Sequence, residues 1–510
     1  MASRLSRSQG LWALTGLGLA GSLLVAYAGP RAVGDRTIGW WYQPGFPPGR
    51  HGAVALVYVG MALLGVAWLG LGRLVATHDW RSPPSARAVA RAPTVRDLLL
   101  IGAVWTVPLL LGPALFSRDV YSYLAQGTIL HTGLNPYHDT PALLAQHGGA
   151  HVLNAVSPFW RHTTAPYGPL FLALLSAIVA ITGSHLIAGV LAIRALELVG
   201  IVLLAVYLPR LARALGTDPG RTIWLALLSP LVIFELVSAG HNDVLMIGLL
   251  AAGVTVALEG RPLPGIAICA LAATIKVPAL AGAVFIAVAW ARAEPSPRDR
   301  VRFLGGALAV VVGVLAAVSL VSGLGVSWLS GSVFSAPARV RLAITPATGV
   351  GWTVASVMHD LGLAVNSRSL ESAFGAVTAV LTVAAGLWLL YRTRIPTLVL
   401  GLGVFLLVAA AGGPAAWPWY FTWGLVLLAA CPGPQRSVGL PVALVLAVFV
   451  VKPNGILALP LGSAPAVLAV YVLVAFAAWY VHRRRDGDSG ADGRSRRSLA
   501  DSAPSALART

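Results

Sequence analysis

The residues best suited to chemistry lie between Ser117 and Tyr137, in a chain of 510 residues that is 57% hydrophobic and only 11% charged. This stretch, S-R-D-V-Y-S-Y-L-A-Q-G-T-I-L-H-T-G-L-N-P-Y, directly follows the apolar run 98–116. A carboxylate can act as a general base on a hydroxyl, an arginine can bind a phosphate bidentately, and aromatic rings can lie against sugars. Candidates here are Arg118, Asp119, Tyr121, Tyr123, Gln126, Asn135 and Tyr137.

Further polar and aromatic residues interrupt the apolar runs later in the chain. They are Tyr167, His241, Asn242, Asp243, Lys276, Arg339, Arg341, Trp417, Trp419, Tyr420 and Lys452. Ionisable residues at membrane depth are costly, and their presence is by default a functional hypothesis. The plainer interpretation is that lysines snorkel from helix ends and tryptophans mark the membrane interface. Most of these clusters fall at helix ends predicted to share one side of the membrane, which favours one shared site.

A mean hydropathy of +0.79 over the whole length excludes a soluble globular protein. A span takes about 20 apolar residues and must satisfy its own backbone groups, so the spans are helices. We predict an all-α, polytopic membrane protein with about 13–15 transmembrane helices. The net charge of +18 comes from arginines in short loops and in the tail. This is the positive-inside pattern, so a lipid bilayer is the expected partner and a nucleic acid is not.

The predicted order along the chain has three parts. Residues 1–96 hold two helices and a basic cytoplasmic loop, residues 97–481 a transmembrane catalytic domain, and residues 482–510 a disordered cytoplasmic tail. Both termini are expected in the cytoplasm. The polar segment 117–165 is expected outside, with an amphipathic helix over 119–131 on the membrane surface, and 323–370 forms a second external segment.

Three local features of the sequence either allow two interpretations or suggest a purely structural role. The run 11–28 resembles a signal peptide but is long enough to span, so an uncleaved first helix is favoured. Two full crossings over 169–182 and 186–208 would place the arginines after them outside, so one segment is re-entrant or the count is off by one. Arg194 and Glu197, three residues apart, are expected to form a structural pair.

Several motifs in order resemble the polyprenol-phosphate-mannose-dependent α-1,6-mannosyltransferases of actinobacteria, which are type C (GT-C) glycosyltransferases. The motifs are S-R-D-V-Y-S-Y-L-A-Q-G, G-L-N-P-Y, A-P-Y-G-P-L, S-A-G-H-N-D-V-L-M, I-K-V-P-A and W-P-W-Y-F-T-W. The resemblance runs from about residue 97 to 480. The preference for arginine over lysine, with only two lysines in the chain, also suits a high-GC genome such as an actinobacterial one.

The resemblance implies a GT-C-like enzyme of the plasma membrane with an extracytoplasmic site. Its donor would be polyprenyl-phosphate-mannose and its acceptor a mannan on a glycolipid anchor, joined by an α-1,6 linkage with inversion. Asp119 would be the catalytic base. Arg118, Lys276, Arg339, Arg341 and Lys452 would bind the phosphate, and the remaining candidates would bind the sugars.

The same resemblance leaves the cofactor open. Some type C enzymes use a divalent metal such as Mg²⁺ or Mn²⁺, and no metal ligands are assigned here. Two other functions compete with mannosyl transfer. One is transfer of another polyprenyl-phosphate sugar, arabinosyl or glucosyl, by the same fold. The other is a lipid-linked sugar flippase or transporter, which the missing internal repeat disfavours.

Overall fold

The computed structural model describes residues 2–34, 40–42, 45, 49–75, 93–329, 341–342, 344–473 and 476. In these ranges the chain forms helices and loops, and its sole β feature is an isolated bridge between Val451 and Leu457. The all-α prediction is therefore confirmed for this part of the chain. The tail 482–510 and Arg339 lie outside the described residues.

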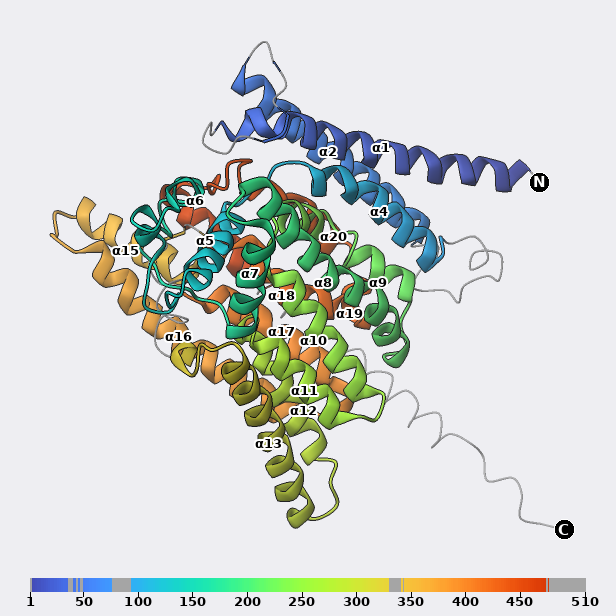
Figure 1. Cartoon of the computed structure of the whole chain (residues 1–510). Helices are drawn as coiled ribbons and strands as arrows, with labels where there is room; N and C mark the ends of the chain where they lie inside the picture. The colour runs from blue at the N-terminus through green and yellow to red at the C-terminus, as the bar shows by residue number, and fades with distance from the viewer. Residues whose placement is uncertain are drawn as a thin grey trace.

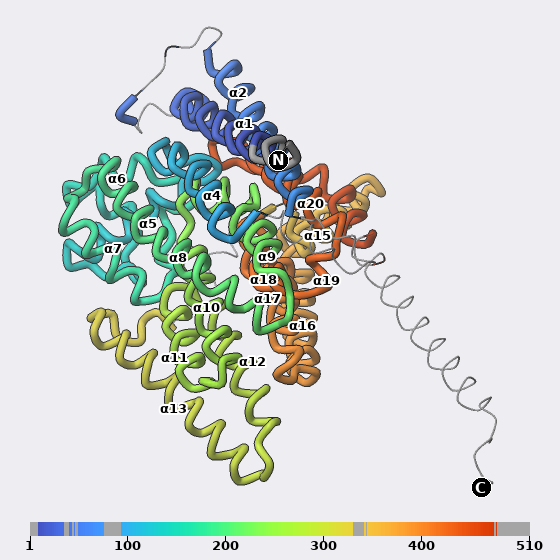
Figure 2. Tube along the Cα trace, turned by 90° about the vertical axis from the view of Figure 1, so that its right-hand side faces the viewer, coloured from blue at the N-terminus to red at the C-terminus, as the bar shows by residue number. Residues whose placement is uncertain are grey.

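Helices α1 (Ala2–Val33) and α2 (Arg50–Val75) lie side by side along one edge of the molecule, next to α4 (Val95–Leu111) (Figure 1, Figure 2). A Cβ added to either Gly21 or Gly60 would lie 2.5 Å from the carbonyl oxygen of the other. Small residues let membrane helices approach this closely. The first apolar run is thus one continuous helix packed on the second.

Helix α5 (Asp119–His131) has the predicted bounds but not the predicted surroundings. It packs against α7 (Pro169–Thr182) and α8 (Leu186–Ala214), and residues 120–129 are all buried. A helix on the membrane surface would expose one face, so the surface placement was wrong. Gly127 allows the close packing, because a Cβ there would lie 2.7 Å from the carbonyl oxygen of Leu175.

Helix α10 (Asp243–Leu258) runs parallel to α8. Gly200 packs on the backbone of Val244, and farther along both helices Arg210 forms an ion pair with Glu259 at 2.5 Å. The π-helix η2 (Val232–Ser238) precedes α10 and meets it at 113°. This bend places His241 and Asn242 in the turn and Asp243 at the start of α10.

Arg194 is buried on α8 and fastens two neighbouring segments together. Its guanidinium donates to the carbonyls of Leu110, Gly112 and Pro113 around the end of α4, and to that of Ser238 in η2. No ion pair joins it to Glu197, whose carboxylate oxygens have no hydrogen-bond partner among the described residues. The predicted Arg194–Glu197 ion pair does not form. The guanidinium of Arg194 donates to four backbone carbonyls instead.

The C-terminal half continues with longer helices around the same core. Helix α13 (Pro297–Val321) projects from one end of the molecule, and the hairpin of α15 (Pro346–Asp360) and α16 (Ser367–Arg392) lies to another side (Figure 1). The other helices are η1 (Pro141–Ala145), α6 (Ala150–Ala155), α9 (Pro219–Leu225), α11 (Pro262–Ala273), η3 (Val277–Ala279), α12 (Leu280–Ala291), η4 (Ser327–Leu329), η6 (Ile395–Thr397), α17 (Leu398–Gly412), η7 (Pro418–Phe421), α18 (Thr422–Leu428), α19 (Pro432–Gln435), α20 (Gly439–Ala447), η8 (Val448–Val450) and η9 (Leu461–Ser463).

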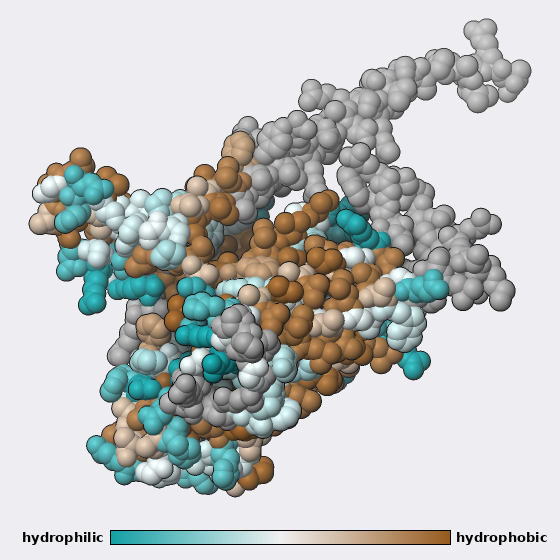
Figure 3. Space-filling view, turned by 90° about the horizontal axis from the view of Figure 1, so that it is seen from above, coloured by the Kyte–Doolittle hydropathy of each residue, from teal (hydrophilic) through white to brown (hydrophobic). Residues whose placement is uncertain are grey.

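Six helices of the described part are long and apolar enough to cross a membrane, or seven if η2 and α10 count as one span. Five further apolar helices are shorter. A broad band of hydrophobic side chains on one face agrees with a multi-pass membrane protein (Figure 3). The 14 residues of α7 extend only about 21 Å, less than the hydrocarbon core, which favours the re-entrant interpretation of this segment.

Candidate active site

Asp119 is the first residue of α5, and a constrained turn brings it there. Helix α4 ends at Leu111, and the short connection that follows includes Phe116, the one non-glycine residue with positive φ (66°) in the described ranges. The N–H group of Asp119 donates to the hydroxyl of Ser117 at 3.1 Å. A helix N-terminus stabilises a carboxylate, so the fold supports a negative charge at this position.

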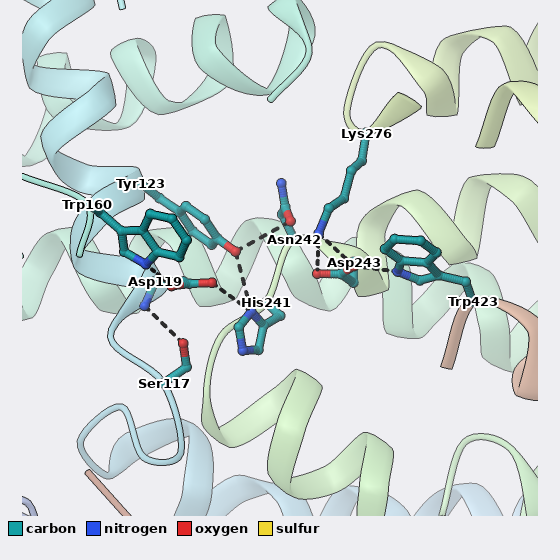
Figure 4. Close-up of polar contacts among 9 residues, drawn as sticks. All are labelled: Ser117, Asp119, Tyr123, Trp160, His241, Asn242, Asp243, Lys276 and Trp423. Atoms are coloured by element: carbon teal, nitrogen blue, oxygen red, sulfur yellow. Dashed lines mark hydrogen bonds and ion pairs between the residues drawn. The ribbon is translucent and has the colours of Figure 1, made fainter. Parts of the chain in front are cut away.

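Two side chains contact the Asp119 carboxylate (Figure 4). Trp160 donates from its indole nitrogen to Oδ1 at 2.9 Å, and Nδ1 of His241 lies 3.7 Å from Oδ2. Burial raises the pKa of Asp119 to about 6, against the lowering effects of Lys276 and of the Trp160 hydrogen bond. Such a carboxylate is ionised near neutral pH and still accepts a proton readily, as a general base requires.

A second carboxylate, Asp243, begins α10 and is held by a lysine. Nζ of Lys276 donates to both oxygens of Asp243, at 2.8 and 2.9 Å, and Trp423 donates to Oδ1 at 2.5 Å (Figure 4). The same Nζ lies 4.6 Å from the ring centroid of Tyr420. Cation–π contact and ion pairing together fix the lysine head group.

Tyr123 contacts the turn that lies between the two carboxylates. Its hydroxyl lies 3.4 Å from Nδ1 of His241 and 3.4 Å from Oδ1 of Asn242, and its ring packs edge-on against Tyr167. The 241–243 turn therefore has one end at Asp119 and the other at Lys276. Tyr123, His241 and Asn242 were predicted as substrate ligands, and the structure places them in this buried bridge.

Aromatic rings form a stack beside Asp119. The imidazole of His241 stacks on Trp419 at 4.1 Å between centroids, and Trp419 stacks on Trp417 at 4.6 Å. This stack extends from the buried histidine toward Trp417, whose ring lines both cavities described next.

The first cavity, here called the lysine cavity, has a volume of about 280 Å³. Asp119 and Lys276 lie in a lining that is otherwise largely aromatic and aliphatic. Part of that lining is Phe405, Leu406 and Ala409 of α17, a helix of the membrane-spanning set. The lining of this cavity also includes four other predicted residues, Gln126, Tyr167, Trp417 and Tyr420. Ligand sites are commonly apolar with few polar groups.

The second cavity, here called the arginine cavity, has a volume of about 480 Å³. Arg118, Asp119 and Trp419 line it, together with Phe159 and Asn454. Asp119, Trp160 and Trp417 line both cavities. These three residues therefore lie in the wall that the two cavities share.

Several predicted residues have partners that give them other surroundings. Arg118 donates to the backbone carbonyls of Asn154 and Ala155, while still lining the arginine cavity. Asn135 closes a local turn by accepting from the N–H group of Tyr137 at 3.0 Å. The hydroxyl of Tyr137 donates to the carbonyl of Tyr167 at 2.8 Å and so braces a wall of the lysine cavity.

Three more predicted residues line neither cavity. Tyr121 is buried on α5. Arg341 forms an ion pair with Glu371 at 3.1 Å, at the hairpin of α15 and α16. Lys452 is exposed. The structure does not bring these three to the carboxylate, and Arg339 lies outside the described residues.

Two site residues were missed by the sequence analysis. Trp160, which donates to Asp119, lies in the polar segment 117–165, where its sequence signal was only its aromatic type. Trp423 ends the motif W-P-W-Y-F-T-W and lies three residues after Tyr420. That spacing puts both rings on one helix face, which would have been sufficient to propose it.

The described residues do not fit a divalent-metal site. No group of three or more His, Cys, Asp or Glu side chains suited to a metal ion occurs among them. Asp243 is already held by Lys276 and Trp423, so Asp119 and His241 are left as a pair. Mg²⁺ and Mn²⁺ prefer several oxygen ligands, and we derive no step through a metal.

Comparison with known proteins decides the family. Residues 10–292 match the model of the alpha-(1->6)-mannopyranosyltransferase N-terminal domain, and residues 345–483 match the MptB C-terminal domain. The chain belongs to the alpha-(1->6)-mannopyranosyltransferase family. This transferase is thus a glycosyltransferase, as the motifs implied.

Relatives support the same assignment across most of the transferase. Alpha-(1->6)-mannopyranosyltransferase A of Mycobacterium tuberculosis is 32% identical over 421 residues, covering 79% of this chain and 77% of the relative. Alpha-(1->6)-mannopyranosyltransferase B of Corynebacterium glutamicum is 28% identical over 479 residues, covering 88% and 77%. The transferase therefore acts in mannosyl transfer, with a sugar donor and an acceptor as substrates.

Proposed function

We propose that this protein transfers mannose from polyprenyl-phosphate-mannose to a lipid-anchored mannan, forming an α-1,6 linkage with inversion at the anomeric carbon. One observation carries the proposal: Asp119 lies in the wall shared by two cavities, and only one of these holds Lys276. This arrangement suits a direct displacement, because the acceptor hydroxyl must meet the base and attack the anomeric carbon from the face opposite the departing phosphate.

In this mechanism the acceptor's 6-hydroxyl attacks the anomeric carbon while Asp119 removes the hydroxyl proton. The bond between the anomeric carbon and the phosphate oxygen breaks, and its electron pair leaves with the polyprenyl phosphate. The new glycosidic bond forms on the opposite face of the sugar, which accounts for inversion. The protonated Asp119 then returns its proton to solvent.

Lys276 would stabilise the leaving group. The donor phosphodiester carries one negative charge, and the departing phosphate monoester gains a second as the bond breaks. A preorganised cation beside this oxygen lowers the barrier because the charge develops there. Asp243, Tyr420 and Trp423 hold the ammonium in place before the substrate arrives.

The lining of each cavity supports the assignment of its substrate. Phe405, Leu406 and Ala409 line the lysine cavity along membrane helix α17, so a polyprenyl chain could enter from the bilayer with its phosphate near Lys276. The arginine cavity carries Phe159, Trp160 and Asn454, which suit the faces and hydroxyls of a mannan.

The proposed site faces the outside of the plasma membrane, with both chain termini in the cytoplasm. Arg210, Arg213 and Arg292 lie at the ends of α8 and α12 that lead away from Asp243 and Lys276. Basic residues mark the cytoplasmic side, so the carboxylates lie toward the opposite side.

A transfer assay tests the proposal. Membranes holding the wild-type protein or Asp119→Asn would receive labelled polyprenyl-phosphate-mannose and an α-1,6-mannoside acceptor, with and without EDTA. We expect chelator-resistant, α-1,6-linked product from wild type and a loss of about 10³-fold or more for the variant. Equal transfer by both proteins would overturn the base assignment. Transfer by wild type only from arabinosyl or glucosyl donors would replace the donor.

A further inference from the structure

A tight turn in the C-terminal part of the chain contacts the residues that directly precede Asp119. The antiparallel bridge between Val451 and Leu457 closes the turn, and the N–H group of Lys452 donates to the carbonyl of Ile456 at 2.8 Å. Gly455 has a φ of +82°, and its N–H group donates to the carbonyl of Lys452 at 2.9 Å. Residues 451–457 are hereafter the closing turn.

The first contact of the closing turn is with Phe116. The N–H group of Phe116 donates to the carbonyl of Pro453 at 3.0 Å. Phe116 has a φ of +66°, a conformation that is strained for a bulky residue and persists only where its surroundings enforce it. The hydrogen bond to the carbonyl of Pro453 and the edge contact with the ring of Phe234 are those surroundings.

The second contact is a backbone approach at Ser117. A Cβ added to Gly455 would lie 3.1 Å from Cα of Ser117, tighter than an ordinary contact. The hydroxyl of Ser117 accepts from the N–H group of Asp119. Gly455 thus packs against Ser117, whose hydroxyl group holds the first turn of α5.

We infer that the closing turn positions the catalytic carboxylate, with Pro453 and Gly455 acting through Phe116 and Ser117. This rests on the proposed role of Asp119 as base. Both contacts are made by the backbone of the turn; among its side chains, Asn454 and Ile456 line the arginine cavity, while Lys452 is exposed and lines neither cavity. The closing turn also ties the two family domains together, because Pro453 and Gly455 belong to the C-terminal one and Asp119 to the N-terminal one.

The test variant is Gly455→Ala in the full-length protein, assayed with the labelled donor and α-mannoside acceptor. The added methyl group pushes on Ser117, and a misplacement of about 1 Å can cost about 100-fold in rate. We expect kcat to fall about tenfold or more. The donor KM should change less than about twofold, because the turn does not line the lysine cavity.

Two matched variants separate positioning from backbone strain. Gly260 has a similar φ of +86° with open space around it, so Gly260→Ala carries the strain without the collision and should retain wild-type kcat. Gly455→Asn tolerates positive φ better than alanine but keeps the colliding Cβ, so it should lose activity like Gly455→Ala. Lys452→Ala should transfer mannose like wild type.

The outcomes distinguish this inference from the proposed function. Normal kcat in Gly455→Ala or in Gly455→Asn, with an active wild type, would overturn the positioning role and leave the base assignment standing. A loss confined to donor KM would also overturn it. An inactive wild type would instead contradict the proposed function. Protein amounts and melting temperatures in detergent, compared with Gly260→Ala, keep folding losses apart from kcat losses.

Discussion

Opposing influences set the proton affinity of Asp119. Burial and the charge of Asp243 raise its pKa, while Lys276, the Trp160 indole and the Ser117 hydroxyl lower it, with a result of about 6. A base must be ionised to accept a proton. The three partners that lower the pKa therefore also set the pH at which the site works.

The first prediction concerns pH. Transfer should rise as pH increases through about 6 and level off above it, because Asp119 loses its proton there. Trp160→Phe removes a hydrogen bond that favours the ionised form, so its midpoint should move upward by about one pH unit. Trp388→Phe, an exposed site on α16, is the control and should follow wild type. A midpoint unchanged in Trp160→Phe would contradict the proposed effect of this bond.

The second prediction concerns the charge beside the leaving group. Lys276→Gln should lower kcat about 10²- to 10³-fold, the usual cost of losing one stabilising group for developing charge. Lys276→Arg should recover part of this loss, because the charge remains while the head group changes shape. Steady-state kinetics with the lipid donor would measure it. A raised donor KM with unchanged kcat would instead assign Lys276 to ground-state binding.

The sequence predicted which residues gather at the site better than what each one does. Asp119, Asp243, Lys276 and the aromatic motif were placed on one side because each ends an apolar run. That Lys276 pairs with Asp243 depends on how α10 meets the segment before η3, and no sequence period encodes such a contact. Lys452 was likewise predicted to bind the phosphate. The sequence could not indicate that the turn around Lys452 contacts Phe116 through its backbone.

At the scale of elements, glycines set how closely the central helices approach. Gly200 of α8 faces α10, where a Cβ would lie 2.4 Å from the carbonyl oxygen of Val244. Helix existence was predictable from apolar runs, and α5 even has the predicted bounds. Burial of α5 was not, because it depends on the close packing of α7 and α8 around it rather than on the composition of α5 itself.

The third prediction tests this packing. Gly200→Ala should destabilise the protein by about 1–3 kcal/mol, the usual cost of overpacking, and lower its melting temperature in detergent. Gly305→Ala on α13 meets nothing within 4 Å and should not. The comparison needs only thermal unfolding of both purified variants. Equal melting temperatures would mean that α8 and α10 can separate at little cost.

At the scale of the whole molecule, one orientation accounts for the arrangement of charge. The Arg210–Glu259 pair joins the far ends of α8 and α10, while Asp243 begins α10 at the other end. Helix bends and short segments, such as η2 and α7, keep the count of full-length spans in the described part at six or seven. A hydropathy pattern counts apolar runs and does not register such bends, so it predicted more spans.

The fourth prediction is the membrane orientation. His147→Cys lies in the exposed part of the 117–165 segment and should react with a membrane-impermeant maleimide on intact cells. Arg298→Cys, at the start of α13, should react only after the cells are opened. The native Cys269 and Cys431 are buried and give little background. The reverse labelling pattern would turn the proposed site toward the cytoplasm.

The shared wall that contains Asp119, Trp160 and Trp417 has a consequence for how the two products leave the enzyme. The spent lipid and the lengthened glycan would depart by separate routes, since each substrate stays in its own cavity and only the mannosyl group crosses. Added polyprenyl phosphate should then compete with the donor but not with the acceptor. A glycan could advance by one sugar without leaving its cavity while one lipid carrier replaces another, so chain growth would not require release after every sugar.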